Sequence, residues 1–332
     1  MSQLKEAVFF LIQALAIVCA SAFFASDVLA QAGEMRAEAR KDLVLKGDAK
    51  CTRCHDENDD YPVLAIGKTK HGTVADARTP SCTSCHGESD GHINKPANAT
   101  ERPKPDRTFT KGSTTPIQAR NDACMSCHKK DSTRTHWEGS THQARDLACT
   151  SCHQIHTQQD RVRTKLTQPE VCYTCHKDQR TQVMRPSRHP IPEGKVACSD
   201  CHNPHGSVGP KLVKRDSVND TCYTCHTEKR GPFVHNHEPV QEDCTICHNP
   251  HGTVAENMLK TRAPFLCHEC HTPHGPNTPQ LLGRQVTPNT VSTTGKNPIN
   301  ITQGRGCLNC HTAVHGSNNP SVSNPTPQFR LR

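Results

Sequence analysis

The chain has 332 residues, of which 33% are hydrophobic and 4% aromatic, and its formal net charge is +8 at pH 7. After residue 30, only about 22% of positions carry an apolar side chain other than cysteine, which excludes a conventional packed core for a protein of this length. The chain is therefore either disordered or filled by something other than side chains. Its 21 cysteines and 23 histidines favour bound cofactors.

The first 30 residues have the layout of a secretory signal peptide. A basic residue precedes an apolar run over residues 7–25, and small residues then lead to a cleavage site near Ala30 or Ala32. The alternative is an uncleaved membrane anchor, because the run is close to the shortest length that spans a bilayer. Cys19 lies within the run and is expected to leave with the signal peptide.

The other 20 cysteines form ten CxxC pairs, and a histidine directly follows each pair. Two thiols three positions apart lie on one side of a helical turn and can bond the two vinyl groups of a haem, while the next imidazole ligates the iron. Zinc ribbons, redox CxxC pairs and disulfides do not require ten adjacent histidines. The cysteines expected to hold ten haem c groups covalently are Cys51, Cys54, Cys82, Cys85, Cys124, Cys127, Cys149, Cys152, Cys172, Cys175, Cys198, Cys201, Cys222, Cys225, Cys244, Cys247, Cys267, Cys270, Cys307 and Cys310. The expected proximal iron ligands are His55, His86, His128, His153, His176, His202, His226, His248, His271 and His311.

A second axial ligand for each iron has to come from the thirteen remaining histidines, because only four methionines follow residue 30. Several of these histidines lie three residues after a proximal one, as in CHNPHG. Three residues span at most about 10 Å, so such an imidazole cannot reach the far face of the same iron and must ligate another haem. The expected distal ligands are His71, His92, His142, His156, His189, His205, His237, His251, His274 and His315.

Three histidines are left over. Position favours His142 over His136 and His237 over His235, but does not decide either choice. His268 lies inside a CxxC pair and is expected to face solvent. Two histidines on each iron would close both axial positions, and without methionine the reduction potentials should be low. This favours an electron conductor over an enzyme.

The spacing of the motifs reveals an internal repeat. Alternate motifs recur every 45 to 50 residues, so five two-haem units account for the chain. Repeats that contact mainly their neighbours form elongated proteins. With 24 prolines, 19 glycines and no strand pattern, the expected fold is a haem-cored multihaem c-type cytochrome, elongated and mostly irregular, with short α-helices and no significant β-sheet.

Four segments outside the motifs carry weaker signals. Residues 34–45 have helix-forming composition, and the proline-rich residues 93–121 and 276–306 are expected to be surface linkers. Residues 316–332 form a polar tail, which is either a free end or a docking segment. The positive charge is expected to offset haem propionates, and no basic run with interleaved aromatics suggests a nucleic-acid partner.

The ten motifs, with the repeated CHNPHG and CYTCH elements, make the chain similar to a known family. It resembles the periplasmic decahaem cytochromes of outer-membrane porin–cytochrome conduits, the MtrA, MtoA and PioA group, and the related DmsE cytochromes. The resemblance implies two pentahaem halves, residues 31–175 and 176–332. It also implies a periplasmic protein held at the outer membrane by a β-barrel porin. Such a protein carries electrons between periplasmic or inner-membrane cytochromes and a surface multihaem cytochrome or extracellular iron or mineral.

Two other functions are compatible with ten haem motifs. The first is a wholly periplasmic electron shuttle, or a donor to a terminal reductase. The second is a multihaem enzyme acting on nitrite or hydroxylamine, which needs an open iron and often has lysine in place of histidine in one motif. None of the ten motifs has that replacement, so we expect an electron-transfer protein rather than an enzyme.

Overall fold

The computed structural model describes residues 48–56, 59–73, 78–271, 306–309 and 311–318. The signal peptide, the segment 34–45, the linker 276–306 except its last residue, the tail beyond residue 318, Cys310 and His274 lie outside these ranges. The described residues fall into two compact units. Those up to Ser126, together with Cys149–Asp160, form the first unit, and Cys127–Ala148 with those from Arg161 onward form the second. The division into pentahaem halves at residue 175 concerns the haems and stays a prediction.

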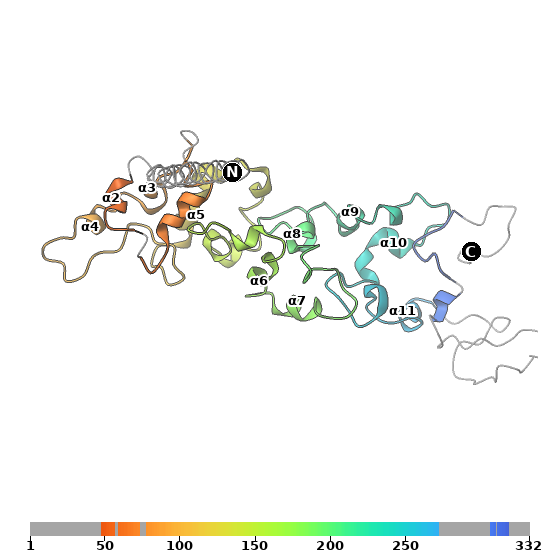
Figure 1. The fold of residues 1–332 in the computed structure, drawn as a ribbon. Coiled ribbons are helices and arrows are strands. Elements are labelled where there is room, and N and C mark those ends of the chain that lie inside the picture. The colour runs from red at the N-terminus through yellow and green to blue at the C-terminus, as the bar shows by residue number, and fades with distance from the viewer. Residues whose placement is uncertain (1–47, 57–58, 74–77, 272–305, 310, 319–332) are drawn as a thin grey trace, which may run out of the picture. The chain divides into compact units, whose positions relative to one another are not determined.

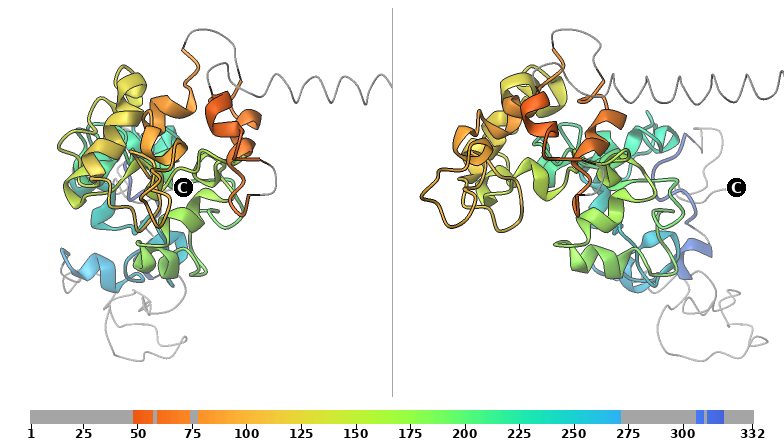
Figure 2. Two further views of the ribbon diagram at one scale, coloured as in Figure 1. Left: turned by 90° about the vertical axis from the view of Figure 1, so that its left-hand side faces the viewer. Right: turned by 60° about the vertical axis from the view of Figure 1, so that its left-hand side comes forward.

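Short helical turns are the regular structure of both units, as Figure 1 and Figure 2 show. The first unit contains α2 (Ala49–Thr52), η1 (Val63–Lys68), α3 (Cys82–His86), α4 (Asp90–Ile93) and η4 (Cys149–Ser151). The helix α5 (Ile117–His128) contributes residues to both units. The second unit contains η2 (Ser132–Arg134), η3 (Gln143–Arg145), η5 (Arg161–Arg163), α6 (Gln168–Cys172), α7 (Lys177–Gln182), α8 (Cys198–Cys201), η6 (Pro210–Leu212), α9 (Val218–Tyr223), η7 (Thr227–Lys229), α10 (Glu238–Glu242), η8 (Cys244–Ile246), η9 (Glu256–Met258), α11 (Phe265–His268) and η10 (Gly306–Asn309).

No residue in the described ranges belongs to a named β-strand. Isolated bridges occur instead, and two of them repeat the same position: His202 pairs with Val213 and His248 with Leu259. Each histidine ends a haem motif and each partner lies eleven residues later, so the bridges show the internal repeat as backbone geometry. No helix of the described part is long and apolar enough to cross a membrane. The expected fold class, mostly irregular with short helices and no sheet, is confirmed.

The apolar interior is small. Among the described residues, the hydrophobic core cluster consists of Tyr173, Val183 and Ile191, with Val196 packed against it. Among the described residues, more polar than apolar residues are buried, including Asp48 at 1% exposed and Asn121 at 4%. Since an interior of this kind cannot be held by side-chain packing alone, the hydrogen bonds of these polar groups become important.

One expectation about the linkers is wrong at its edge. Residues 94–116 contain no helix, as expected of a linker. The segment 117–121, however, is the start of α5, and its Arg120 and Asn121 are buried. The reason is that Asn121 has a structural partner in a distant haem motif, which is described below.

Candidate functional site

The described CxxCH motifs form helical turns. The backbone N–H of the histidine donates to the carbonyl of the first cysteine, at 2.8 to 3.0 Å, in the motifs that begin at Cys51, Cys149, Cys172, Cys198, Cys222, Cys244, Cys267 and Cys307. This bond places the two thiols and the imidazole on one surface of the turn, as attachment to one haem requires. None of the nineteen described cysteines forms a disulfide.

The first cysteines of consecutive motifs meet in pairs. The thiols of Cys51 and Cys82 are hydrogen-bonded to each other. The same contact joins Cys172 to Cys198, Cys222 to Cys244 and Cys267 to Cys307. Burial, with help from the carboxylate of Asp48, raises the pKa of the Cys82 thiol to about 12. Two consecutive motifs that meet in this way therefore form one two-haem unit, whatever the length of chain between them.

A buried polar side chain ties together the two motifs in four of the five two-haem units. Asp48 accepts from the backbone N–H of Cys82 (2.8 Å), Asn121 from that of Cys149 (2.9 Å) and Asn219 from that of Cys244 (2.7 Å). Each lies three residues before the first motif of its unit and caps the start of the second. Gln168, four residues before Cys172, accepts from Ser199 N–H at 2.9 Å in the same way.

The sequence reasoning above did not identify these capping residues. The signal that could have found them is an amide or carboxylate three residues before alternate CxxCH motifs. That signal is short, and it fails at the motifs of Cys172 and Cys267, where Pro169 and Pro264 occupy the position. The signal can be interpreted only when the structure shows how close the polar side chain lies to the second motif.

Asn219→Ala is expected to destabilise the unit around Cys222 and Cys244. The side chain accepts from Cys244 N–H and donates to the carbonyls of Val240 (2.9 Å) and Gln241 (3.1 Å), so its loss should cost about 1–3 kcal/mol of unfolding free energy. Guanidinium denaturation of the haem-loaded protein measures this loss. The exposed Asn98→Ala is the matched control, and equal stability of the two variants would contradict the capping role.

Seven proximal histidines face seven expected distal histidines, and in every pair the ring centroids are 6.0 to 6.3 Å apart. The two histidines of each pair belong to the same compact unit of the fold, although they are up to 70 residues apart along the chain. They are His55–His92, His86–His156, His176–His142, His226–His189, His202–His251, His271–His237 and His248–His315.

This spacing fits a metal ion between the rings. A metal–imidazole bond of about 2 Å on each side, added to the ring radius, places the centroids of two axial ligands about 6 Å apart. The angle between ring planes varies from 10° to 74° while the centroid distance hardly changes. That combination is expected when each ring is free to rotate about a common axis through the metal. The residues present therefore fit a bis-histidine haem.

The second nitrogen of these imidazoles is engaged in a way that leaves Nε2 for the iron. Nδ1 hydrogen-bonds to a backbone carbonyl in His142 (Pro204, 2.8 Å), His189 (Pro250, 2.8 Å) and His237 (Val314, 2.9 Å). The three acceptors occupy the same repeat position, directly before a trailing histidine. Such a bond orients the ring and fixes the tautomer that a metal ligand needs.

Burial keeps several of these imidazoles neutral, the form that binds a metal. It lowers the pKa of His202 and His248, whose Nδ1 atoms hydrogen-bond to the carbonyls of Lys211 (3.0 Å) and Asn257 (2.8 Å). Lys211 and Asn257 both have positive φ, 51° and 54°, so the two repeats use the same unusual turn to present the carbonyl. Burial lowers the pKa of His86, His251 and His315 as well.

The remaining expected ligands are not members of these seven pairs. His128, His153 and His311 on the proximal side, and His71 and His205 on the distal side, all have described positions, and His153 donates through Nδ1 to the carboxylate of Asp160. His274 lies outside the described residues. The assignment of all twenty histidines as iron ligands, these six included, stays a prediction.

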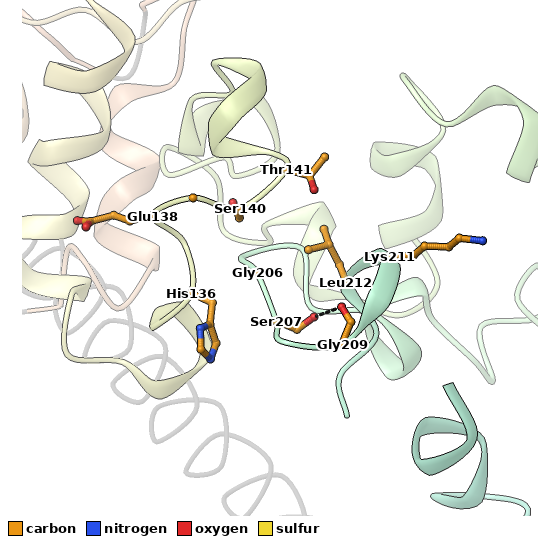
Figure 3. Close-up of a pocket in the computed structure, with 10 residues that line it drawn as sticks. His136, Glu138, Ser140, Thr141, Gly206, Ser207, Gly209, Lys211 and Leu212 are labelled. Atoms are coloured by element: carbon orange, nitrogen blue, oxygen red, sulfur yellow. Dashed lines mark hydrogen bonds between the residues drawn. The ribbon is translucent and has the colours of Figure 1, made fainter. Parts of the chain in front are cut away.

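Of the left-over histidines, His136 and His235 are not in the seven pairs, whereas their competitors His142 and His237 are. His136 lines a cavity of about 360 Å³ between residues 136–141 and 206–212 (Figure 3). The expectation that His268 faces solvent is wrong. Its side chain is half-buried, Nδ1 lies 3.2 Å from the carbonyl of His271, and Nε2 is fully buried. No group of three or more Cys, His, Asp or Glu side chains in the described ranges is arranged to hold a metal ion by itself.

Comparison with known proteins points to the same class of cofactor. Residues 189–231 and 237–276 match the doubled CXXCH motif, and residues 82–166 match the NrfB-like c-type cytochromes. The chain is also 44% identical over 280 residues to the multiheme cytochrome MtrA of Shewanella baltica (strain OS185), covering 83% of this chain and 80% of the relative. The resemblance noted in the sequence is thereby confirmed, and the chain belongs to the family of multihaem c-type cytochromes that includes MtrA.

Proposed function

We propose that the chain holds ten haem c groups, each between two histidines, and conducts electrons across the outer membrane inside a porin. The observation that carries the proposal is the set of seven facing imidazole pairs with nearly constant centroid distance. Ten CxxCH motifs supply the count of ten haems. When bound, the haems supply one-electron redox chemistry at iron.

The residues of the site support conduction rather than catalysis. Two facing imidazoles would hold the iron from both sides and would leave no open site there for nitrite, hydroxylamine or another substrate. Histidine is present at every motif, so no motif has the lysine that opens an iron for catalysis. With two histidines and no methionine on the metal, the reduction potentials should be low.

Location and partners follow from the family and from the signal-like start of the chain. Residues 1–30 should direct export, and attachment of haem c takes place outside the cytoplasm. Relatives of this type imply a β-barrel porin as the partner that admits a polar protein to the membrane. Periplasmic or inner-membrane cytochromes would exchange electrons at one end, and a surface multihaem cytochrome or extracellular iron or mineral at the other.

Liposomes with an entrapped redox dye and an external reductant test this proposal. We expect dye reduction only when both the cytochrome and its porin are in the membrane. The porin alone carries no haems, and the cytochrome alone is too polar to enter the bilayer. The porin alone and the cytochrome alone are the controls. Equal dye reduction without the porin would contradict a transmembrane conductor, and rapid exchange only with soluble periplasmic carriers would identify a shuttle instead.

A further inference from the structure

Two proximal histidines have a carboxylate oxygen within hydrogen-bond distance of Nδ1. His55 Nδ1 lies 2.9 Å from Asp59 Oδ2, and His153 Nδ1 lies 2.6 Å from Asp160 Oδ2. Eight other imidazoles have a neutral backbone carbonyl at this position, at 2.7 to 3.0 Å. Those eight are His86, His92, His142, His156, His189, His202, His237 and His248. The acceptors of His55 and His153 can therefore carry a full negative charge.

The two carboxylates differ in how firmly they are held. Asp160 has 13% of its side chain exposed, against 30% for Asp59, and its second oxygen accepts from Gln154 N–H at 3.3 Å. The shorter and more buried bond of Asp160 is less screened by water. Its influence on the attached imidazole should therefore exceed that of Asp59.

A charged acceptor at Nδ1 changes the imidazole as a ligand. The N–H donates more strongly to a carboxylate than to a carbonyl, which raises electron density at Nε2 and makes the ring a stronger donor to a metal. A stronger donor and a nearby negative charge both stabilise the ferric state relative to the ferrous state. Hydrogen bonding of the axial ligand is one of the means by which a protein sets the potential of a haem.

We propose that Asp59 and Asp160 are positioning residues that lower the reduction potentials of the haems ligated by His55 and His153, with the larger effect at Asp160. This rests on the proposed haem ligation by these histidines. Both aspartates belong to the first unit, so the inference gives that unit two sites that are harder to reduce than their carbonyl-bonded equivalents would be. The sequence conceals the similarity, because the carboxylate follows its histidine by four residues in one case and by seven in the other.

Asp160→Asn and Asp59→Asn test the inference in the full-length, haem-loaded protein. Asparagine keeps an oxygen that can accept from Nδ1 but removes the charge. In potentiometric titrations followed by haem absorbance, one haem of each variant should shift to a higher potential. The expected shift for Asp160→Asn is about tenfold in the ratio of reduced to oxidised haem at a fixed potential, which is about 59 mV for one electron, and the shift for Asp59→Asn should be smaller.

Two further measurements separate this inference from its alternatives. Asp131→Asn is the matched control, since Asp131 bonds to Thr133 and Arg134 rather than to a histidine. EPR of the ferric protein should show an altered low-spin signal for one haem in the Asp160→Asn and Asp59→Asn variants. Asp160→Glu keeps the charge, so its potential should lie closer to that of the unaltered protein than the potential of Asp160→Asn does. Unchanged potentials, or a shift equal to that of Asp131→Asn, would overturn the inference. A high-spin signal in the unaltered protein would instead show that the proposed bis-histidine ligation is wrong.

Discussion

His142→Ala is expected to convert one haem from low spin to high spin, whereas His136→Ala leaves every haem low spin. The reason is that the His142 ring lies 6.1 Å from that of the proximal His176, the distance of two ligands on one metal, while His136 lines a cavity in Figure 3. Loss of one axial imidazole leaves an open iron, which should bind carbon monoxide or cyanide. Absorption and EPR spectra of the variants measure this change directly.

The same comparison applies at the other undecided position. His237 faces His271 at 6.0 Å, so His237→Ala should open one haem and His235→Ala should open none. His142→Met provides a second control, because methionine should restore the low-spin state while raising the potential of that haem. A high-spin haem in His136→Ala or His235→Ala, with none in the His142 and His237 variants, would contradict the pairing described above.

The apoprotein, made without haem attachment, is expected to be unfolded. The described core cluster of Tyr173, Val183 and Ile191 is too small to offset the conformational entropy of a chain of this length. The paired cysteines and facing imidazoles would then have no cofactor between them, so folding and haem binding should be coupled, as in small metal-binding domains. Without haem, the loss of folded structure should be complete rather than partial.

Far-UV circular dichroism and limited proteolysis of the apoprotein measure this outcome. We expect a disordered spectrum, no cooperative thermal transition and rapid cleavage throughout the chain, against a protease-resistant haem-loaded protein. The control is the haem-loaded protein at the same concentration and ionic strength. A compact apoprotein with a cooperative transition would show that side chains, and not cofactors, build the interior.

The covalent chemistry was readable from the sequence because it is local. Two cysteines and a histidine within five residues form one helical turn, so the 3.6-residue period of a helix is enough to predict which groups face one haem. The lack of apolar residues, and the abundance of proline and glycine, likewise predicted short helices without a sheet. These are properties of composition and near neighbours, and the described residues confirm them.

The capping residues missed by the sequence reasoning depend on contacts between distant segments. Asn121 was assigned to a linker because its neighbours are polar and proline-rich, yet it is buried and caps the motif at Cys149. His268 was expected to face solvent because it lies between two haem-binding cysteines, yet its Nε2 is buried. The partner of Asn121 comes within reach only when two haem motifs come together, whereas the Nδ1 of His268 has its partner, the carbonyl of His271, within its own motif.

By itself, then, the sequence determined the cofactor class, the number of attachment motifs and the supply of histidines for a second ligand. Only the tertiary structure decided which imidazole faces which. His156 lies three residues from the proximal His153 but faces His86, and His251 lies three residues from His248 but faces His202. The physical reason is reach, because a short link holds two imidazoles near one another without allowing them to oppose each other across a metal, and opposition requires a second segment folded back from elsewhere in the chain.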